Sequence, residues 1–234
     1  MSQCVLGICD GSGFLYDEAT NTAYDCRCRP QIVARNKARG LSAVIPKRYR
    51  DIGFDRFPVT EIEPRATVTA TRRFADQVSE RLDEGRGLWF IGAVGTGKTT
   101  LAMLVTKAAL DAGRSAARYS MPGLLSRIRE TFDSGSHMSL LEQLTAVDLL
   151  HIDDIGAEQT TPWVLEELYS IVNSRYEERR SMVITTNVQD RAALKEQITA
   201  RTLSRLTEMC EELPVLGPDH REDPHAADGQ SRAA

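Results

Sequence analysis

Short runs of apolar residues recur along the last two thirds of the chain, and longer amphipathic segments separate them. The runs lie at 88–91, 116–119, 147–152, 182–186 and 213–216. Successive positions in each run are almost all apolar, which is typical of parallel strands that helices cover on both faces. The pattern predicts an α/β fold in which helices flank a five-stranded parallel sheet.

The amphipathic segments show the spacing of helices. Phe74, Val78 and Leu82 are four residues apart and predict a helix around 71–84 with one buried face. A second helix is expected after Thr161, where apolar residues recur at helical spacing among charged ones.

The two ends of the chain lack this alternation. The first 28 residues hold four of the five cysteines among glycines, and residues 26–50 are basic and contain no Asp or Glu. The last 18 residues contain no large apolar side chain, so most of them are expected to be disordered. We divide the chain into a Cys-rich module (1–40), a basic linker (41–66), an α/β domain (67–216) and a polar tail (217–234).

Overall composition limits the classes of partner. The formal net charge of the 234 residues is −4, so contact with DNA would have to be local. No apolar run approaches the roughly 18 residues of a membrane-spanning helix, and the N-terminus lacks the pattern of a signal peptide. We therefore expect a cytoplasmic protein without membrane contact, whose cysteines are metal ligands or free thiols.

The segment after the first predicted strand reads GAVGTGKT over residues 92–99 and has the Walker A spacing G-x4-G-K-[ST]. Its glycines let backbone N–H groups surround a phosphate, and the next helix directs its positive end at the same anion. We expect Lys98 to reach the β and γ phosphates of ATP and Thr99 to place its hydroxyl on Mg²⁺. A turn that binds nothing would need neither this Lys-Thr pair nor the spaced glycines.

Polar residues end the next two candidate strands of the site. Asp153 and Asp154 follow the third strand, where Asp153 would hold Mg²⁺ through its water shell and Asp154 would polarise the attacking water. A solvated turn or a helix cap is the alternative. Asn187 ends the fourth strand and could orient the same water, or it could open the turn toward Asp190. His151 is expected to be a packed strand residue without a role.

Two arginines lie downstream of these strands. Arg201 and Arg205 are one helical turn apart, roughly opposite an apolar stripe, so both should project from the core. Such a pair is either solvated or able to reach the γ-phosphate of a neighbouring subunit as an arginine finger.

With these blocks in place, residues 41–221 resemble the AAA+ ATPases of the DnaC/DnaI helicase-loader and IstB transposition-helper group. The resemblance rests on IPKRYRDIGF (45–54), GLWFIGAVGTGKTTLA (87–102), DLLHIDDIGAE (148–158), NSRYEER (173–179), ITTN (184–187), SRLTEMC (204–210) and VLGPDHR (215–221). It implies a P-loop AAA+ domain that acts as an ATP-controlled switch. The implied partners are a second copy of the chain, a replicative DnaB-type helicase and single-stranded DNA.

The resemblance also implies roles for single residues. Asn187 matches the sensor 1 position, Arg205 matches the arginine-finger block, and Arg221 resembles the sensor 2 region. Residues 121–144 correspond to an inserted helix that faces DNA in loaders, so Arg127 and Arg129 are expected phosphate contacts or, equally, surface residues. The expected nucleotide-binding residues are Gly92, Gly95, Thr96, Gly97, Lys98, Thr99, Thr100, Asp153 and Arg221.

The N-terminal cysteines favour the helicase-loader branch of this group. Loaders similar to DnaI begin with C-x2-C-x-G-x-G and a later C-x-C, whereas IstB proteins usually begin with a helical segment that lacks cysteines. This chain departs from the pattern at Leu6, and its first cysteine lies two residues earlier. We expect a structural Zn²⁺ in a module that docks on the helicase, with reduced free thiols as the alternative. The expected zinc ligands are Cys4, Cys9, Cys26 and Cys28.

Three other functions compete with this interpretation. A transposition helper belongs to the same family. A small-molecule kinase would need an acceptor pocket and a mobile basic lid, which the sequence does not show. A nucleotide-dependent scaffold with negligible turnover is favoured by Asp154, which replaces the longer Glu common in active AAA+ ATPases. We therefore expect slow ATP hydrolysis, stimulated by a partner or by DNA.

Overall fold

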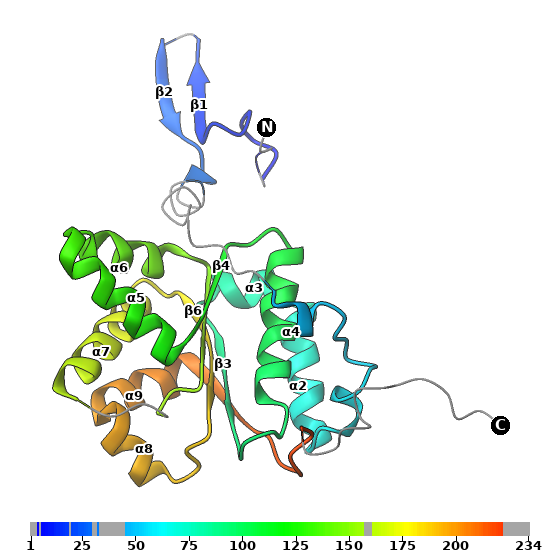
Figure 1. Cartoon of the computed structure of the whole chain (residues 1–234). Coiled ribbons are helices and arrows are strands. Elements are labelled where there is room, and N and C mark those ends of the chain that lie inside the picture. The colour runs from blue at the N-terminus through cyan, green and yellow to red at the C-terminus, as the bar shows by residue number, and fades with distance from the viewer. Residues whose placement is uncertain are drawn as a thin grey trace.

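The computed structural model of the chain describes residues 4, 6–18, 20–29, 32, 45–156 and 161–221, with 133 and 134 as backbone only. These residues form a two-stranded antiparallel hairpin and a five-stranded parallel sheet with helices on both faces (Figure 1). No helix among them is both long enough and apolar enough to cross a membrane.

The parallel sheet confirms the predicted fold class. Its strands are β3 (Gly87–Ile91), β4 (Ala116–Ser120), β5 (Leu149–Asp153), β6 (Ser181–Thr186) and β7 (Cys210–Pro214). They are arranged in the order β4-β5-β6-β3-β7, and neighbouring strands are parallel throughout. The predicted positions are most displaced at β7, which begins at Cys210 because an edge strand tolerates the polar Glu211 and Glu212.

Two layers of helices cover the sheet. One layer contains α2 (Arg65–Asp76), α3 (Val78–Asp83) and α4 (Lys98–Asp111). The other contains α5 (Met121–Ser134), α6 (His137–Ala146), α7 (Pro162–Glu177), α8 (Arg191–Ile198) and α9 (Ala200–Met209). Each layer forms its own apolar core against one face of the sheet, which explains why the strands are apolar on both faces.

The helix expected over 71–84 is instead two helices. Gln77 leaves the helical conformation with φ −108° and ψ 21°, which ends α2 before α3 begins. Phe74, Val78 and Leu82 are nevertheless buried in one core, as their spacing predicts.

Residues 45–66, which the sequence assigns to a linker, pack against the α/β domain. Two short 3-10 helices, η1 (Lys47–Tyr49) and η2 (Val59–Glu61), lie in this segment. Val59 and Ile62 are fully buried in the core that contains α2 and α4. A Cβ on Gly97 would lie 2.4 Å from Ile62 Cδ1, so the segment reaches the Walker A loop. Residues 41–44 lie outside the described part of the chain.

The start of the predicted tail also lies on the domain. After β7, Val215 N–H donates to Ile91 O at 2.7 Å, and His220 N–H donates to Gly95 O at 3.1 Å. The start of the predicted tail therefore lies against the Walker A loop at His220, a placement that polar composition alone does not predict. Residues 222–234 fall outside the described residues.

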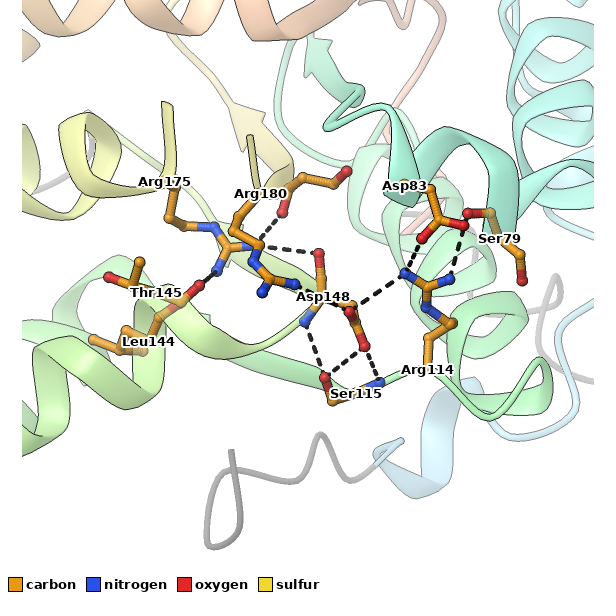
Figure 2. Close-up of polar contacts among 10 residues, drawn as sticks. Ser79, Asp83, Arg114, Ser115, Leu144, Thr145, Asp148, Arg175 and Arg180 are labelled. Atoms are coloured by element: carbon orange, nitrogen blue, oxygen red, sulfur yellow. Dashed lines mark hydrogen bonds and ion pairs between the residues drawn. The ribbon is translucent and has the colours of Figure 1, made fainter. Parts of the chain in front are cut away.

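A buried arginine on α7 joins the amino ends of two strands (Figure 2). Arg175 is fully buried. Its guanidinium donates to four backbone carbonyls, those of Leu144, Thr145, Asp148 and Ser181. The Asp148 carboxylate in turn accepts from Ser115 N–H at 2.9 Å and pairs with Arg114 and Arg180. These contacts fix how β4, β5 and β6 begin, and hence where their carboxyl ends meet.

The N-terminal hairpin consists of β1 (Phe14–Asp17) and β2 (Thr22–Asp25). Most of its side chains are exposed, and the four N-terminal cysteines lie on the chain before and after it. The hairpin therefore has little apolar burial of its own to stabilise it.

Candidate nucleotide-binding site

The carboxyl ends of β3, β5 and β6 open into a cleft of about 690 Å³. Most residues expected to bind the nucleotide, and two of those expected to hydrolyse it, line this cleft together. They are Gly95, Gly97, Lys98, Thr99, Thr100, Asp153, Asp154, Asn187 and Arg221. Gly92 and Thr96 lie behind this lining, where Gly92 N–H donates to Thr186 O and buried Thr96 donates to Ala93 O.

The Walker A loop has the shape of an anion-binding nest. Gly95 and Gly97 adopt left-handed conformations, with φ 78° and 101°, before α4 begins at Lys98. Lys98 Nζ donates to Ala93 O at 2.6 Å, so the ammonium group folds back over the loop. Burial lowers the pKa of Lys98, although nearby Asp154 opposes this effect. A phosphate in the loop would compensate the buried charge.

Asp153 and Thr99, the two expected Mg²⁺ ligands, are in direct contact. Thr99 Oγ1 donates to Asp153 Oδ1 at 3.0 Å, and Thr185 Oγ1 donates to the same oxygen at 2.7 Å. A hydroxyl and a carboxylate held together on one side of a phosphate loop are the oxygen ligands that Mg²⁺ prefers. These residues fit the ion that the family implies.

The pKa of Asp153 lies below its ordinary value. Burial alone would raise it. In the acidic range where Asp153 titrates, the charge of protonated His151 and the hydroxyl groups of Thr185 and Thr99 outweigh burial, and Arg118 adds to their effect. Asp153 is therefore a carboxylate at neutral pH, as a metal ligand must be.

Asp154 and Asn187 meet at the same edge of the sheet. Asn187 Nδ2 donates to Asp154 Oδ1, and Asp154 N–H donates to Thr185 Oγ1 at 2.8 Å. Asp154 has φ 67°, a conformation that costs energy in a residue other than glycine and is concentrated at functional sites. The turn toward α8 is capped by Asp190, which accepts from Ala193 N–H, so Asn187 is not needed there.

His151 is a packed strand residue, as expected from the sequence. It is fully buried, and its Nδ1 lies 2.9 Å from Thr106 Oγ1 on α4. Burial lowers the pKa of His151 to about 4, so the ring is neutral at physiological pH.

The three downstream arginines have different environments. Arg221 lines the cleft, and its charge contributes to lowering the pKa of Lys98. Arg201 on α9 is exposed, as predicted. Arg205 does not project freely, because its guanidinium lies 5.0 and 5.4 Å from the ring centroids of Tyr169 and Tyr176. The periodicity of α9 alone could not reveal these tyrosines on α7.

Arg127 and Arg129 are both exposed on α5. Arg127 pairs with Glu130, and Arg129 lies 4.6 Å from the ring centroid of Trp163.

Several cleft residues were missed by the sequence interpretation. They are Arg48, Tyr49, Ile52, Phe57, Pro58 and His220. The ring of Phe57 meets that of His220 edge to face, with 6.1 Å between centroids, so the two segments are in contact where they line the cleft. The IPKRYRDIGF block was the available signal, but nothing in it shows that it folds back onto the Walker A loop.

The N-terminal cysteines form one cluster. The sulfur atoms of Cys4, Cys9, Cys26 and Cys28 all lie within 4.8 Å of one another. Four thiolates around a tetrahedral Zn²⁺ would lie about 3.8 Å apart at the usual Zn–S distance, so the set fits the ion. Leu6, at the usual position of the first ligand, is half exposed, whereas Cys4 reaches the cluster.

The cluster also favours ionisation of one thiol. Backbone N–H groups of Cys9 and Ile8 lower the pKa of Cys4 to about 6. A thiolate is the form that binds a metal.

Comparison with known proteins identifies the family. Residues 66–226 match the family model of the IstB-like ATP binding protein. The chain belongs to this family. It is 27% identical over 183 residues to the replicative helicase loader DnaC of Buchnera aphidicola subsp. Acyrthosiphon pisum, covering 75% of this chain and 73% of that protein.

Solved structures agree with this assignment. A crystal structure of the DnaC helicase loader matches with a TM-score of 0.64 and 28% identity, covering 73% of this chain and 99% of that one. The replication initiator DnaA, bound to AMPPCP and single-stranded DNA, shares the fold with a TM-score of 0.63 at 18% identity, covering 75% of this chain and 52% of that one. The chain is therefore an AAA+ P-loop protein of an ATP-binding family related to helicase loaders.

Proposed function

We propose that this protein is an ATP-controlled switch that loads or remodels a replicative DnaB-type helicase on single-stranded DNA. The likeness to DnaC carries the proposal, because it covers 99% of the solved loader chain, and the matched ATP-binding family model spans the Walker A and Walker B segments. The rival kinase interpretation leaves the Asn187 contact and the arginine block without a purpose.

The cleft supports slow ATP hydrolysis. Lys98 would bind the β and γ phosphates, while Thr99 and Asp153 would hold Mg²⁺, which supplies charge stabilisation when bound. Asp154, held by Asn187, would accept a proton from the attacking water. The shorter reach of Asp compared with Glu favours a low basal rate.

Self-assembly on ATP would supply a further catalytic group. Arg205 does not line the cleft of its own chain, so it would act on the nucleotide of a neighbouring subunit. Tyr169 and Tyr176 would hold the guanidinium in a defined orientation on the surface of α7.

The cysteine cluster supports the helicase-loader branch over the transposition-helper branch. We propose that one Zn²⁺ joins the four cysteines and that the resulting module docks on the helicase. Metal binding would provide the stability that the exposed hairpin lacks.

The test is complex formation with two purified partners, the replicative helicase of the same organism and the transposase of an IstB-type element. Size-exclusion chromatography with light scattering, with and without ATP, should show a complex with the helicase. Cys28→Ser should lose that complex and keep nucleotide binding. A complex with the transposase alone would replace this proposal by the transposition-helper function.

A further inference from the structure

An arginine on the edge strand of the sheet forms an ion pair with the carboxylate that is expected to bind Mg²⁺. Arg118 lies on β4, and its guanidinium donates to Asp153 Oδ2 at 3.0 Å. The two side chains are 24% and 13% exposed, so water screens the pair only weakly. Nothing in the Walker motifs requires a cation at this position.

The other oxygen of the carboxylate is also occupied. Asp153 Oδ1 accepts from Thr99 and Thr185, and buried His151 Nε2 lies 4.0 Å away without a hydrogen-bond partner among the described residues. Within the described part of the chain, Arg118 is the guanidinium that pairs directly with Asp153, at 3.0 Å from Oδ2.

We propose that Arg118 is a resident cation that competes with Mg²⁺ for Asp153 and so weakens the affinity of the site for the ion. The inference rests on the proposed role of Asp153 and Thr99 in holding Mg²⁺. A guanidinium stays charged at any pH at which the protein is folded, so it always opposes a nearby divalent ion. Mg²⁺ with its water shell must either displace the guanidinium from Oδ2 or lie beside it against repulsion.

This arrangement makes nucleotide binding depend little on Mg²⁺. Arg118 already compensates the charge of Asp153, so the carboxylate does not repel an incoming phosphate chain when the ion is absent. Nucleotide would then bind without Mg²⁺, whereas hydrolysis would need the ion and would rise with its concentration.

The experiment measures the affinity of the ADP complex for a divalent ion. Protein in excess over ADP is prepared in metal-free buffer, and Mn²⁺ is titrated while electron paramagnetic resonance follows the free ion. Arg118→Met should bind Mn²⁺ about tenfold more tightly than wild type, because one fixed positive charge near the ion is removed. Arg118→Lys keeps the charge and should stay close to wild type.

Two further variants complete the test. Arg72→Met removes an arginine from the exposed pair with Asp55 and should leave Mn²⁺ affinity unchanged. Arg118→Gln replaces Arg118→Met if the apolar side chain prevents folding.

The sign of the change decides the outcome. Unchanged or weaker Mn²⁺ affinity in Arg118→Met or Arg118→Gln, with normal ADP binding, would show that Arg118 does not compete with the ion. Absence of ADP binding in wild type would instead overturn the proposed nucleotide function, and this inference with it.

Discussion

Asp154 shows how one side chain depends on two neighbouring strands. It leaves β5 in a left-handed conformation, and β6 supplies both Thr185, which accepts from its N–H, and the position from which Asn187 donates to its carboxylate. The adjacent strands therefore hold the carboxylate where a base is needed. The sequence placed Asp154 at this edge from its position alone, since the carboxyl ends of parallel neighbours lie together, and its role as a base stays a prediction.

We expect Asp154→Asn to bind ATP like wild type and to lose hydrolysis by about 100-fold or more, because the amide cannot accept the proton. Stopped-flow binding of a fluorescent ATP analogue and a phosphate-release assay measure the two properties. Asp190→Asn, on the α8 cap, is the matched control and should hydrolyse ATP normally. Turnover close to wild type in Asp154→Asn would assign the base elsewhere.

The residues that the sequence did not assign share one property. Arg118, Phe57 and His220 reach the site only because separate segments pack together, and their local patterns are those of a strand, a loop and a polar tail. Walker A was predictable because one short segment contains its whole geometry.

At the scale of elements, a hydrogen-bond network joins the amino ends of the strands, at the opposite edge of the sheet from the site. Arg175 on α7 binds backbone carbonyls before β5 and at the start of β6, and Asp148 ties β5 to β4 (Figure 2). The strand runs were predictable from apolar pattern, but this network was not, since SRY in the sequence resembles an ordinary surface turn of a helix.

Arg175→Leu should lower the free energy of unfolding by about 3 kcal/mol, because four backbone carbonyls, two of them in buried hydrogen bonds, lose their donor. Urea denaturation followed by circular dichroism measures the change. Arg127→Leu, in an exposed pair with Glu130, should change stability by no more than about 0.5 kcal/mol. Equal stability of the two variants would mean that water satisfies the carbonyls.

We expect the folding of the N-terminal hairpin module to depend on its metal ion. We expect one Zn²⁺ per chain, and Cys26→Ser should lose the metal and unfold the N-terminal module while the α/β domain keeps its thermal transition. Metal analysis and differential scanning calorimetry measure both effects, with Cys210→Ser as a control that keeps zinc. A metal-free protein with four readily alkylated N-terminal thiols would contradict the zinc site.

For the whole molecule, we propose that one chain binds the nucleotide and that Arg205 acts on the nucleotide of a neighbouring chain. The cleft holds the residues expected to bind nucleotide, whereas Arg205, on α9, is not among its lining residues and places its guanidinium over Tyr169 of α7. The sequence predicted an outward-facing finger, but the stack on Tyr169 and Tyr176 depends on how α7 and α9 pack.

Arg205→Ala should bind ATP with wild-type affinity and show no rise in hydrolysis rate when it assembles with its partner, because the trans-acting cation is missing. A coupled ATPase assay with and without helicase and DNA measures this. Arg201→Ala, one turn away on the same helix, is the control and should retain stimulation. Full stimulation of Arg205→Ala would leave the stacked arginine with a structural role alone.

The most direct test of the central claim is helicase loading itself. The protein is mixed with the replicative helicase of the same organism, ATP and single-stranded DNA circles coated with single-strand-binding protein, and helicase retained on the DNA is quantified after gel filtration. The account predicts that wild type deposits helicase on the circles and that Lys98→Ala, which cannot bind the phosphates, does not. Helicase that reaches the coated circles equally well without the protein, or with Lys98→Ala, would contradict it.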